Sequence, residues 1–346
     1  MGPGGSRKDS RNANGIFSTA PVGQVEVAVR VLAVINPVAG RGRALRLWPR
    51  LRPHFVRAGW SVSEALSEAP GHAIELVAQA QDYDGFLAVG GDGTSHEVAN
   101  GILRAPDAGM RFLAVVPLGT ANDFAAGIGL PLHPEEAVRA LITGRTRRID
   151  VGRVSYRFFL AIAGCGFDAE VARRVNAWPK LFGGKVTYVA GIFHKLAMFR
   201  PVRAEITADG RVWVQPLFML AAGNLPAYAG GLRMCPDARP TDGLLDVVLV
   251  RDVARWEVVL LLPRLLDGSH VRHPKVAVVR AKEVSVRAHV PLAVHADGEF
   301  QGLTPVQFTC HPQALDVLVP VPAVEARPLP HRAAEPARLT TGFTVR

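Results

Sequence analysis

The 346-residue sequence is poor in cysteine and contains no long apolar run. Its three cysteines, Cys165, Cys235 and Cys310, are far apart and have no C-x-x-C spacing. An odd number of scattered cysteines argues against a disulfide framework and is typical of a reducing compartment. No stretch approaches the roughly 18 apolar residues of a membrane-spanning helix, and the segment before Gln24 lacks the apolar core of a signal peptide. We therefore expect a cytoplasmic protein that meets a membrane only from the water side.

Several well-known nucleotide and metal motifs are also absent. The sequence has no G-x-x-x-x-G-K-[ST] segment, which excludes an ordinary P-loop NTPase. The pair Gly40-x-Gly42 is followed by Leu45 where a dinucleotide-binding fingerprint would have its third glycine. The protein-kinase motifs are missing as well. His96-Glu97 lacks the second histidine of an H-E-x-x-H motif, which excludes a zinc site of that type.

The sequence has fewer acidic than basic residues. The chain has 40 Lys+Arg against 30 Asp+Glu, a formal net charge of +10. This balance favours an anionic partner, either nucleic acid, nucleotide phosphate or an acidic membrane surface. No lysine- and arginine-rich run has the density of a nucleic-acid-binding tail. We therefore expect no nucleic acid partner, and part of the excess is compatible with an ordinary arginine-rich surface.

The chain divides into two regions of different sequence pattern. Residues 27–145 alternate strand-like and helix-like segments, which indicates a nucleotide-binding α/β domain with a parallel sheet. Residues 146–322 are dominated by short strand-like segments with tight turns, typical of an antiparallel β-sandwich. The last apolar segment, residues 315–319, fits a strand of either domain. The predicted fold class is thus α/β plus all-β.

Other segments carry separate expectations. Residues 1–26 and 323–346 are predicted to be a flexible leader and a disordered tail. Helices are expected at 180–199 and 254–266. The stretch 176–200 mixes aromatic and basic residues, so it either lies on an anionic bilayer or packs its apolar face on the core.

The most informative feature is a set of three glycine-containing loops, each directly after a predicted parallel strand. They occupy residues 36–42, 90–94 and 117–123. Glycine lets backbone N–H groups approach a phosphate closely, and the N-terminus of a following helix adds a favourable dipole. Because parallel strands end at the same edge of a sheet, the three loops predict a nucleotide site there. Thr94 and Glu97 also match a T-x-x-E capping box, a role compatible with that site.

These motifs resemble those of the diacylglycerol kinase catalytic family, the lipid kinases that also include bacterial lipid kinases and the sphingosine and ceramide kinases. The matching elements occur in the family's order: Asn36-Pro37 with Gly40, residues 90–94 with Glu97-Val98 and Asn100-Gly101, residues 117–124, and Asp297-Gly298-Glu299. The resemblance implies a nucleotide-binding domain, a β-rich lipid-binding domain and an active site in the cleft between them. It also implies Mg²⁺ as cofactor, ATP as phosphate donor and a lipid hydroxyl as acceptor.

The resemblance implies ATP contacts for a defined set of residues. They are Asn36, Pro37, Val38, Ala39, Gly40, Ser67, Gly91, Asp92, Gly93, Thr94, Ser95, His96, Glu97 and Thr120. Ser67 stands where the family usually has threonine, and it keeps the hydroxyl group. Asp92 would act through Mg²⁺ and water rather than as a direct phosphate contact.

Residues 236–246 resemble the family's metal loop. This resemblance implies a Mg²⁺ ion near Arg239, Asp242 and Leu244, with Arg239 and Leu244 contributing only backbone carbonyl groups. The alternative is that Asp242-Gly243 is a plain turn before the next strand.

Two carboxylates late in the sequence complete the expected catalytic set with Asp92. By resemblance, Glu299 is the proton acceptor and Asp297 belongs to the acidic cluster. Paired carboxylates suit this chemistry, because an attacking alcohol must lose its proton during phosphoryl transfer. The alternative for residues 297–299 is a tight hairpin turn without a catalytic role.

One departure from the family pattern bears on the substrate. The family commonly has Leu-Asn after Gly-Asp-Gly-Thr, whereas this chain has Ser95-His96, a feature associated with sphingosine kinases. Diacylglycerol, giving phosphatidic acid, is the leading acceptor, and a sphingoid base or another lipid is the alternative. An NAD-kinase-like enzyme, which shares the Gly-Gly-Asp-Gly-Thr loop, is more remote. The expected partners are ATP, the lipid and an anionic membrane surface bound peripherally, and a homodimer is left open.

Overall fold

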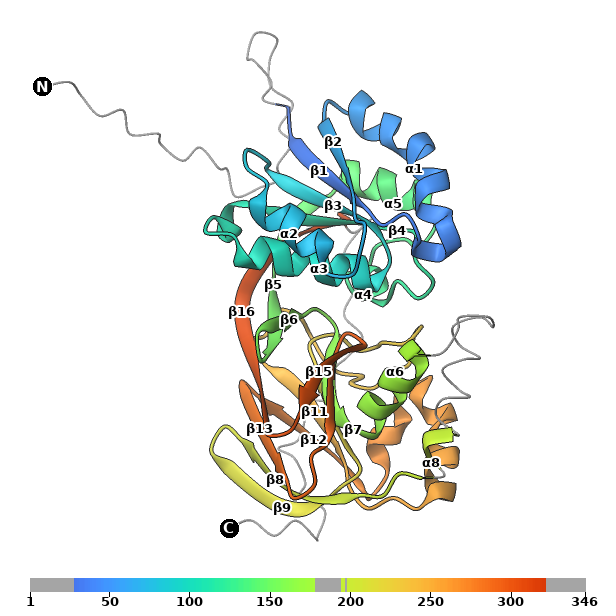
Figure 1. The fold of residues 1–346 in the computed structure, drawn as a ribbon, viewed down its shortest axis with the longest axis vertical. Helices are drawn as coiled ribbons and strands as arrows, with labels where there is room; N and C mark the ends of the chain where they lie inside the picture. The colour runs from blue at the N-terminus through green and yellow to red at the C-terminus, as the bar shows by residue number, and fades with distance from the viewer. Residues whose placement is uncertain (1–27, 178–193, 197, 322–346) are drawn as a thin grey trace, which may run out of the picture.

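The structure is a computed structural model that describes residues 28–177, 194–196 and 198–321. Figure 1 shows two bodies stacked along the long axis, with the first part of the chain forming one body and most of the remainder the other. The predicted leader and tail, the predicted helix at 180–199 and most of the stretch 176–200 lie outside the described residues. The expectations about them stay predictions.

Four parallel strands form the sheet of the first body, in the order β2-β1-β3-β4. They are β1 (Arg30–Ile35), β2 (Ser61–Leu66), β3 (Gly85–Gly90) and β4 (Phe112–Pro117). β3 and β4 are buried along their whole length, which explains their continuous apolar sequences, because a central parallel strand is covered on both faces. The connecting helices are α1 (Ala39–Arg57), α2 (His72–Gln79), α3 (Asp92–Arg104), η1 (Ala108–Met110), α4 (Asp123–Gly127) and α5 (Pro134–Ile142).

The second body contains an antiparallel six-stranded sheet in the order β12-β11-β10-β7-β14-β15. Its strands are β7 (Ile162–Gly166), β10 (Met219–Gly223), β11 (Leu245–Val250), β12 (Val276–Ala281), β14 (Ala293–Ala296) and β15 (Glu299–Leu303). One face packs against β8 (Val202–Ala208), β9 (Arg211–Leu217) and β13 (Glu283–Ala288), with Ile206, Leu220, Val247 and Phe308 in the shared core. The fold is therefore α/β plus antiparallel β, as the sequence predicts.

Helical segments cover the other face of this six-stranded sheet. They are α6 (Phe167–Ala177), α8 (Arg255–Leu261), η2 (Pro263–Leu265) and η3 (Ser269–Arg272). Val171 of α6 and Val258 of α8 belong to the same apolar cluster as Val248 and Val250 of β11. The predicted helix at 254–266 corresponds to α8 followed by the single turn η2.

One long strand connects the two bodies. β16 (Val306–Val319) pairs in parallel with β4 at Asp316 and antiparallel with β13 at Val306, so one ten-stranded sheet runs from the first body into the second. β5 (Arg145–Val154), which also pairs with β6 (Arg157–Phe159), follows β16 antiparallel, and both cross the junction in Figure 1. The apolar segment 315–319 is the end of this strand. Backbone hydrogen bonds therefore fix how the two bodies face each other.

Candidate active site

The three glycine loops meet at one edge of the parallel sheet. Gly40, Arg41 and Gly42 have left-handed backbone angles, with φ of 57°, 60° and 79°, so the regular part of α1 starts only after this loop. A Cβ atom added to Gly40 would clash with the carbonyl oxygen of Leu118 in the third loop. The loops touch backbone to backbone, which only glycine allows here.

Polar side chains hold the first two loops together. Asn36 donates from Nδ2 to Thr94 Oγ1 at 3.2 Å, and its Oδ1 accepts the Val38 N–H at 3.1 Å. Ser67, directly after β2, donates its backbone N–H to the Ile35 carbonyl at 2.9 Å, which places it beside the first loop. Thr120 is exposed in the third loop. The structure thus brings this part of the predicted ATP-contact set to a single edge.

The next three predicted ATP contacts have side chains that bind within the protein. Ser95 donates from Oγ to the Gly91 carbonyl at 3.3 Å. His96 is buried and faces Asp297 of the second body at 2.9 Å. The carboxylate of Glu97 accepts backbone N–H groups at the start of α2. Their predicted contacts with ATP remain untested expectations.

The predicted capping box of Thr94 and Glu97 is wrong. Helix α3 begins at Asp92 with Gly91 as its N-cap, so Thr94 already lies inside the helix. Glu97 instead accepts N–H groups of the α2 start, from Gly71 at 2.9 Å and from Ala73 at 3.2 Å. Glu97 therefore caps a neighbouring helix, a long-range contact that the local pattern did not indicate.

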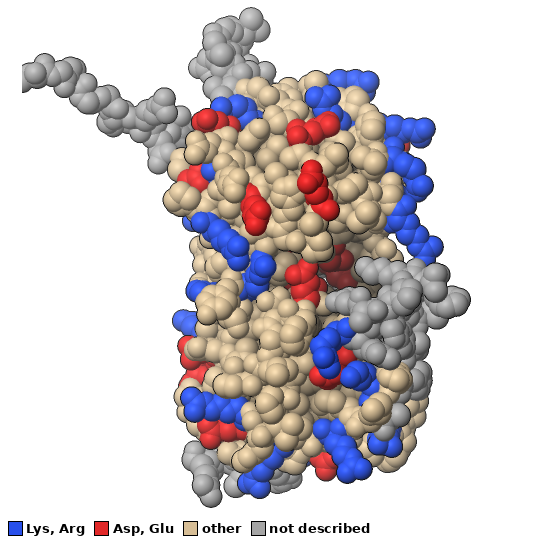
Figure 2. All heavy atoms as spheres, in the orientation of Figure 1, with Lys and Arg blue, Asp and Glu red and all other residues tan. Residues whose placement is uncertain are grey.

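Carboxylates from both bodies gather at the waist between them. Asp92, Asp123 and Asp297 line a cavity of about 790 Å³, counting its open mouth, and Figure 2 shows acidic atoms in this hollow. Burial is the main cause that raises the pKa of Asp92 to about 6; the Phe124 N–H bond opposes it, and the charges of Asp123 and Asp297 add to it. A carboxylate destabilised by neighbouring negative charge is a favourable place for a divalent cation.

Asp123 is a site residue that the sequence analysis did not single out. Its carboxylate accepts the backbone N–H groups of Gly230 and Gly231 at 2.8 Å each, joining α4 of the first body to a loop of the second. The only signal was its position in the Asn-Asp-Phe segment that follows the third glycine loop. The sequence pattern therefore identified the segment as part of the site but assigned no role to the Asp123 carboxylate.

Asp297 is anchored in the turn between β14 and β15. Its Oδ1 accepts the N–H groups of Ala161 at 2.9 Å and Ile162 at 3.2 Å, and its Oδ2 accepts Leu160 N–H at 2.8 Å. Oδ2 also lies 2.9 Å from His96 Nδ1. Burial would raise the pKa of Asp297, but the bond and charge of His96 and the backbone N–H groups hold it below its usual value. Asp297 is therefore a carboxylate whose acceptor positions are filled by the protein.

Glu299 lies two residues after Asp297, at the start of β15. Asp297 and Gly298 both have positive φ, 47° and 85°, so residues 297–299 do form a tight turn. The side chain of Glu299 is 43% exposed, and its Oε2 lies 3.9 Å from His96 Nε2. Asp297 and Gly298 of this turn line the acidic cavity, so the turn and the catalytic interpretations of this segment are not exclusive.

Two family models match the two bodies in turn. Residues 30–154 match the model described as "Diacylglycerol kinase catalytic domain", and residues 161–319 match "YegS C-terminal NAD kinase beta sandwich-like domain". The chain belongs to the diacylglycerol kinase catalytic family. Membership makes it an ATP-dependent lipid kinase and implies ATP as the phosphate donor.

Relatives and solved structures agree with this assignment. The "Diacylglycerol kinase" of Staphylococcus carnosus (strain TM300) is 29% identical over 293 residues, covering 84% of this chain and 95% of the relative. That of Staphylococcus aureus (strain MRSA252) is also 29% identical, with 84% and 92% covered. A crystal structure of a diacylglycerol kinase from Bacillus anthracis str. Sterne superposes with a TM-score of 0.67 at 21% identity, covering 86% of this chain and 98% of that one. At this identity the crystal structure supports the fold alone.

In the expected metal loop, residues 236–246, the negative charge of the aspartates is balanced by an arginine of the protein itself. Arg280 of β12 forms ion pairs with the carboxylates of Asp242 and Asp246, the latter at 3.0 Å. The other oxygen of Asp242 accepts the Leu244 N–H at 3.1 Å. Because Arg280 supplies the positive charge, the arrangement does not favour a metal ion, and the site at Arg239, Asp242 and Leu244 stays a prediction.

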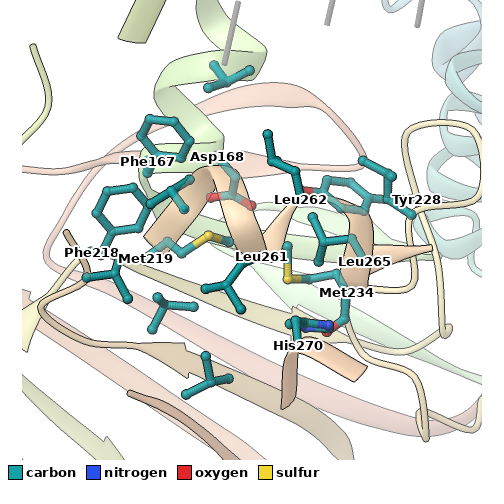
Figure 3. A pocket seen from close by; sticks show the side chains of 16 residues that line it. Phe167, Asp168, Phe218, Met219, Tyr228, Met234, Leu261, Leu262, Leu265 and His270 are labelled. Atoms are coloured by element: carbon teal, nitrogen blue, oxygen red, sulfur yellow. The ribbon is translucent and has the colours of Figure 1, made fainter. Parts of the chain in front are cut away.

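A second cavity in this lipid kinase is almost wholly apolar. It lies between the six-stranded sheet and the helices that cover it, and Figure 3 shows Phe218, Met219, Met234, Leu261 and Leu262 pointing into it. It comprises about 610 Å³ of space, counting its open mouth. An apolar cavity of this kind suits hydrocarbon rather than a nucleotide.

Tyr228 lies where the two cavities meet, because it lines both of them. Its ring stacks on His295, with centroids 6.3 Å apart, and His295 Nε2 lies 2.8 Å from Asp168 Oδ2. His295 lines the acidic cavity and Asp168 the apolar one. The sequence analysis missed all three residues, because they come from separate segments and belong to no local motif.

Proposed function

We propose that this lipid kinase transfers the γ-phosphate of ATP to the hydroxyl of diacylglycerol, giving phosphatidic acid. The observation that carries the proposal is the junction at Tyr228, where an acidic cleft beside the glycine loops adjoins an apolar cavity. A glycerolipid has the same division, with a reactive hydroxyl at one end and hydrocarbon at the other. The curated relatives, named diacylglycerol kinases, support this acceptor.

The glycine loops are the proposed phosphate-binding part of the site. Helix α3 has 13 residues, and its N-terminus starts at Asp92 directly after the Gly90-Gly91 pair, so its first N–H groups lie beside the loops. Such N–H groups and the helix dipole favour phosphate oxygens. Asp92 and Asp123 would hold Mg²⁺, which uses few protein carboxylates and takes its other ligands from water and phosphate. When bound, the metal neutralises charge that develops on the transferring phosphoryl group.

Glu299 is the proposed base. Its half-exposed carboxylate directly follows Gly298, which lines the acidic cavity together with the anchored Asp297. The hydroxyl proton passes to a Glu299 oxygen as the bond between the lipid oxygen and phosphorus forms and the bond to ADP breaks. Asp297, whose oxygens already accept four contacts, sets the position of this turn rather than taking the proton.

The acyl chains are proposed to enter the apolar cavity. We expect Leu261→Trp, which fills part of this cavity, to raise the KM for long-chain diacylglycerol by about 15-fold. That factor corresponds to lost burial of about two CH₂ groups at ~0.8 kcal/mol each. The KM for ATP and the turnover of a water-soluble short-chain diacylglycerol should change little. Leu132→Trp is the matched control, since Leu132 is exposed, lies in the first body and does not line the cavity.

The assay that tests the proposed function uses labelled ATP, Mg²⁺ and separate samples of diacylglycerol micelles, sphingosine micelles and NAD. Label in phosphatidic acid as the main product supports the proposal. Label mainly in sphingosine phosphate would instead identify a sphingoid base as the acceptor, the alternative that the Ser95-His96 pair favours. Label in NAD alone, or equal long-chain KM values for Leu261→Trp and wild type, would contradict the lipid assignment of the cavity.

An anionic membrane surface is the proposed docking partner, with α8, η2 and the adjacent Leu266 as the contact. Trp256, Leu260 and Leu266 are 66%, 61% and 68% exposed, and Arg255 and Arg264 beside them are exposed too. The opposite side of the same segment lines the apolar cavity. Exposed aromatic and aliphatic side chains flanked by arginine suit the interface of an anionic bilayer. None of the helices among the described residues combines the length and the apolar character of a membrane span.

Vesicle flotation checks this contact. Wild-type protein should float with phosphatidylglycerol-containing vesicles, and binding should weaken as salt rises, because exposed charges are screened. Leu260→Glu should lower the bound fraction several-fold. Leu45→Glu, which changes a half-exposed leucine on α1, should bind like wild type. Unchanged flotation of Leu260→Glu would exclude α8 as the docking element.

A further inference from the structure

His96 of α3 lies between two carboxylates of the second body. Its side chain is 1% exposed, its Nδ1 lies 2.9 Å from Asp297 Oδ2 and its Nε2 lies 3.9 Å from Glu299 Oε2. Nε2 is buried and has no hydrogen-bond partner among the described residues. A buried nitrogen that faces a carboxylate only slightly beyond hydrogen-bond distance needs an explanation, because an unmade buried bond is costly.

The orientation of the ring follows from Asp297. That carboxylate accepts N–H groups from Leu160, Ala161 and Ile162, so its contact with His96 requires Nδ1 to donate as well. Nε2 is then left to face Glu299. The geometry is that of an imidazole held by one carboxylate and presented to another.

The charges around the ring favour its protonated form. Burial lowers the pKa of His96, but the hydrogen bond and charge of Asp297 and the charge of Glu299 outweigh it, so the pKa is raised above its usual value. Arg157 of β6 is the cation that opposes this shift. Protonated His96 donates from both nitrogens, one to each carboxylate.

The contact between α3 and β6 has its own support and does not need the His96 ring. Asn100, one turn along α3, donates from Nδ2 to the carbonyl groups of His96 and Phe158, each at 2.9 Å. Its Oδ1 accepts the Phe158 N–H at 3.0 Å. A purely structural role is therefore already filled at this interface by Asn100.

We propose that His96 is a positioning residue that bridges Asp297 and Glu299 and directs the Glu299 carboxylate at the acceptor hydroxyl. The inference rests on the proposed function, since it assigns Glu299 as the base. During transfer the lipid proton moves to Glu299, the new P–O bond forms and ADP leaves, while His96 keeps its two protons. An oriented base accepts the proton without first ordering its own side chain, which is the advantage of positioning.

Two substitutions separate the two contacts of the ring. His96→Asn keeps a donor near the position of Nδ1 for Asp297 and removes the donor to Glu299. His96→Gln keeps a donor near the position of Nε2 for Glu299. We expect His96→Asn to lower kcat by about 10- to 100-fold, as is typical when a group that orients a reactive residue is lost. KM for ATP and the thermal midpoint should stay near wild type, and His96→Gln should retain the larger kcat.

The pH profile of kcat is the readout that a structural role would not change. Wild-type kcat should decline on the alkaline side as His96 loses its proton, and this decline should be missing in both variants, because amides do not titrate there. Equal kcat values for His96→Asn and wild type, or an alkaline limb that persists in the variants, would overturn the role of His96. Failure of the proposed function looks different, because wild-type protein would then not phosphorylate diacylglycerol.

A measurement without turnover tests the bridge itself. The imidazole C–H resonance of His96, followed by NMR across pH, gives the titration midpoint of the ring. Glu299→Gln removes a negative charge beside Nε2, so the midpoint should move to lower pH. Glu283→Gln, the same change at an exposed glutamate of β13, should leave it in place. An unchanged midpoint in Glu299→Gln would show that the two side chains do not interact.

Discussion

Glu299→Gln is expected to lower kcat by about 10²–10⁴-fold while ATP affinity changes little. A primary alcohol is a poor nucleophile at neutral pH, and the substitution removes the oxygen that accepts its proton without changing side-chain size. The loss corresponds to roughly 3–5 kcal/mol of barrier. Steady-state kinetics with saturating lipid give kcat, and nucleotide titration by calorimetry gives the affinity.

The control for this prediction is Glu283→Gln, which makes the same chemical change at an exposed residue of β13 in the second body and should be fully active. If Glu299→Gln keeps more than about a tenth of wild-type kcat, the general-base assignment is wrong, since base removal costs more than that. Damage confined to Gly298 variants would instead favour the hairpin-turn interpretation of residues 297–299.

Asp92→Asn is expected to abolish lipid phosphorylation and, at the same time, to stabilise the metal-free protein at pH 7.5. The amide keeps the acceptor for the Phe124 N–H but removes the charge that would hold Mg²⁺. The carboxyl of Asp92 has a pKa raised to about 6 from 3.8, so the folded state binds its proton more tightly than the unfolded state. The protonated carboxyl therefore adds to the free energy of unfolding. This contribution is complete below pH 3.8, the pKa in the unfolded state, and is lost as the pH rises through about 6. The loss is at most about 3 kcal/mol.

Thermal melts with and without Mg²⁺ check this prediction. Without Mg²⁺, the melting temperature of Asp92→Asn should exceed that of wild type by more at pH 7.5 than at pH 5. Adding Mg²⁺ at pH 7.5 should raise the melting temperature of wild type but not that of the variant. Asp252→Asn, at an exposed aspartate, should match wild type in both respects. A fully active Asp92→Asn enzyme, or one that Mg²⁺ stabilises as much as wild type, would remove Asp92 from the metal site.

Residues 90–94 illustrate how much a local pattern can predict here. Three glycines and a carboxylate directly after an apolar strand indicated a phosphate-binding loop at the edge of a parallel sheet, because strand, turn and helix start are all encoded within a few neighbouring residues. The continuous apolar runs of β3 and β4 likewise identified strands that are buried on both faces. The two-part α/β and β-rich organisation followed from the change of pattern near residue 145.

Inference from local sequence patterns gave a wrong partner for Glu97 and assigned no role to Asp123. A capping box is a local match, but the partner of Glu97 is the start of α2, which only packing brings near it. Asp123 occurred in a matched segment, yet its two N–H donors come from residues 230 and 231. A side chain's partner depends on which segments the fold places beside it, and a pattern within one segment carries no such information.

By itself, the sequence determined the fold class, the glycine loops and the family, because these depend on short runs of neighbouring residues. The tertiary structure alone decided what surrounds the reactive groups. His96 meets Asp297 across 201 positions, Tyr228 joins an acidic cavity to an apolar one, and Arg280 neutralises the predicted metal loop. The first two contacts require β5 and β16 to hold the second body against the first, whereas Arg280 meets Asp246 because β12 pairs with β11. Both arrangements arise from pairing between strands that are far apart in the chain.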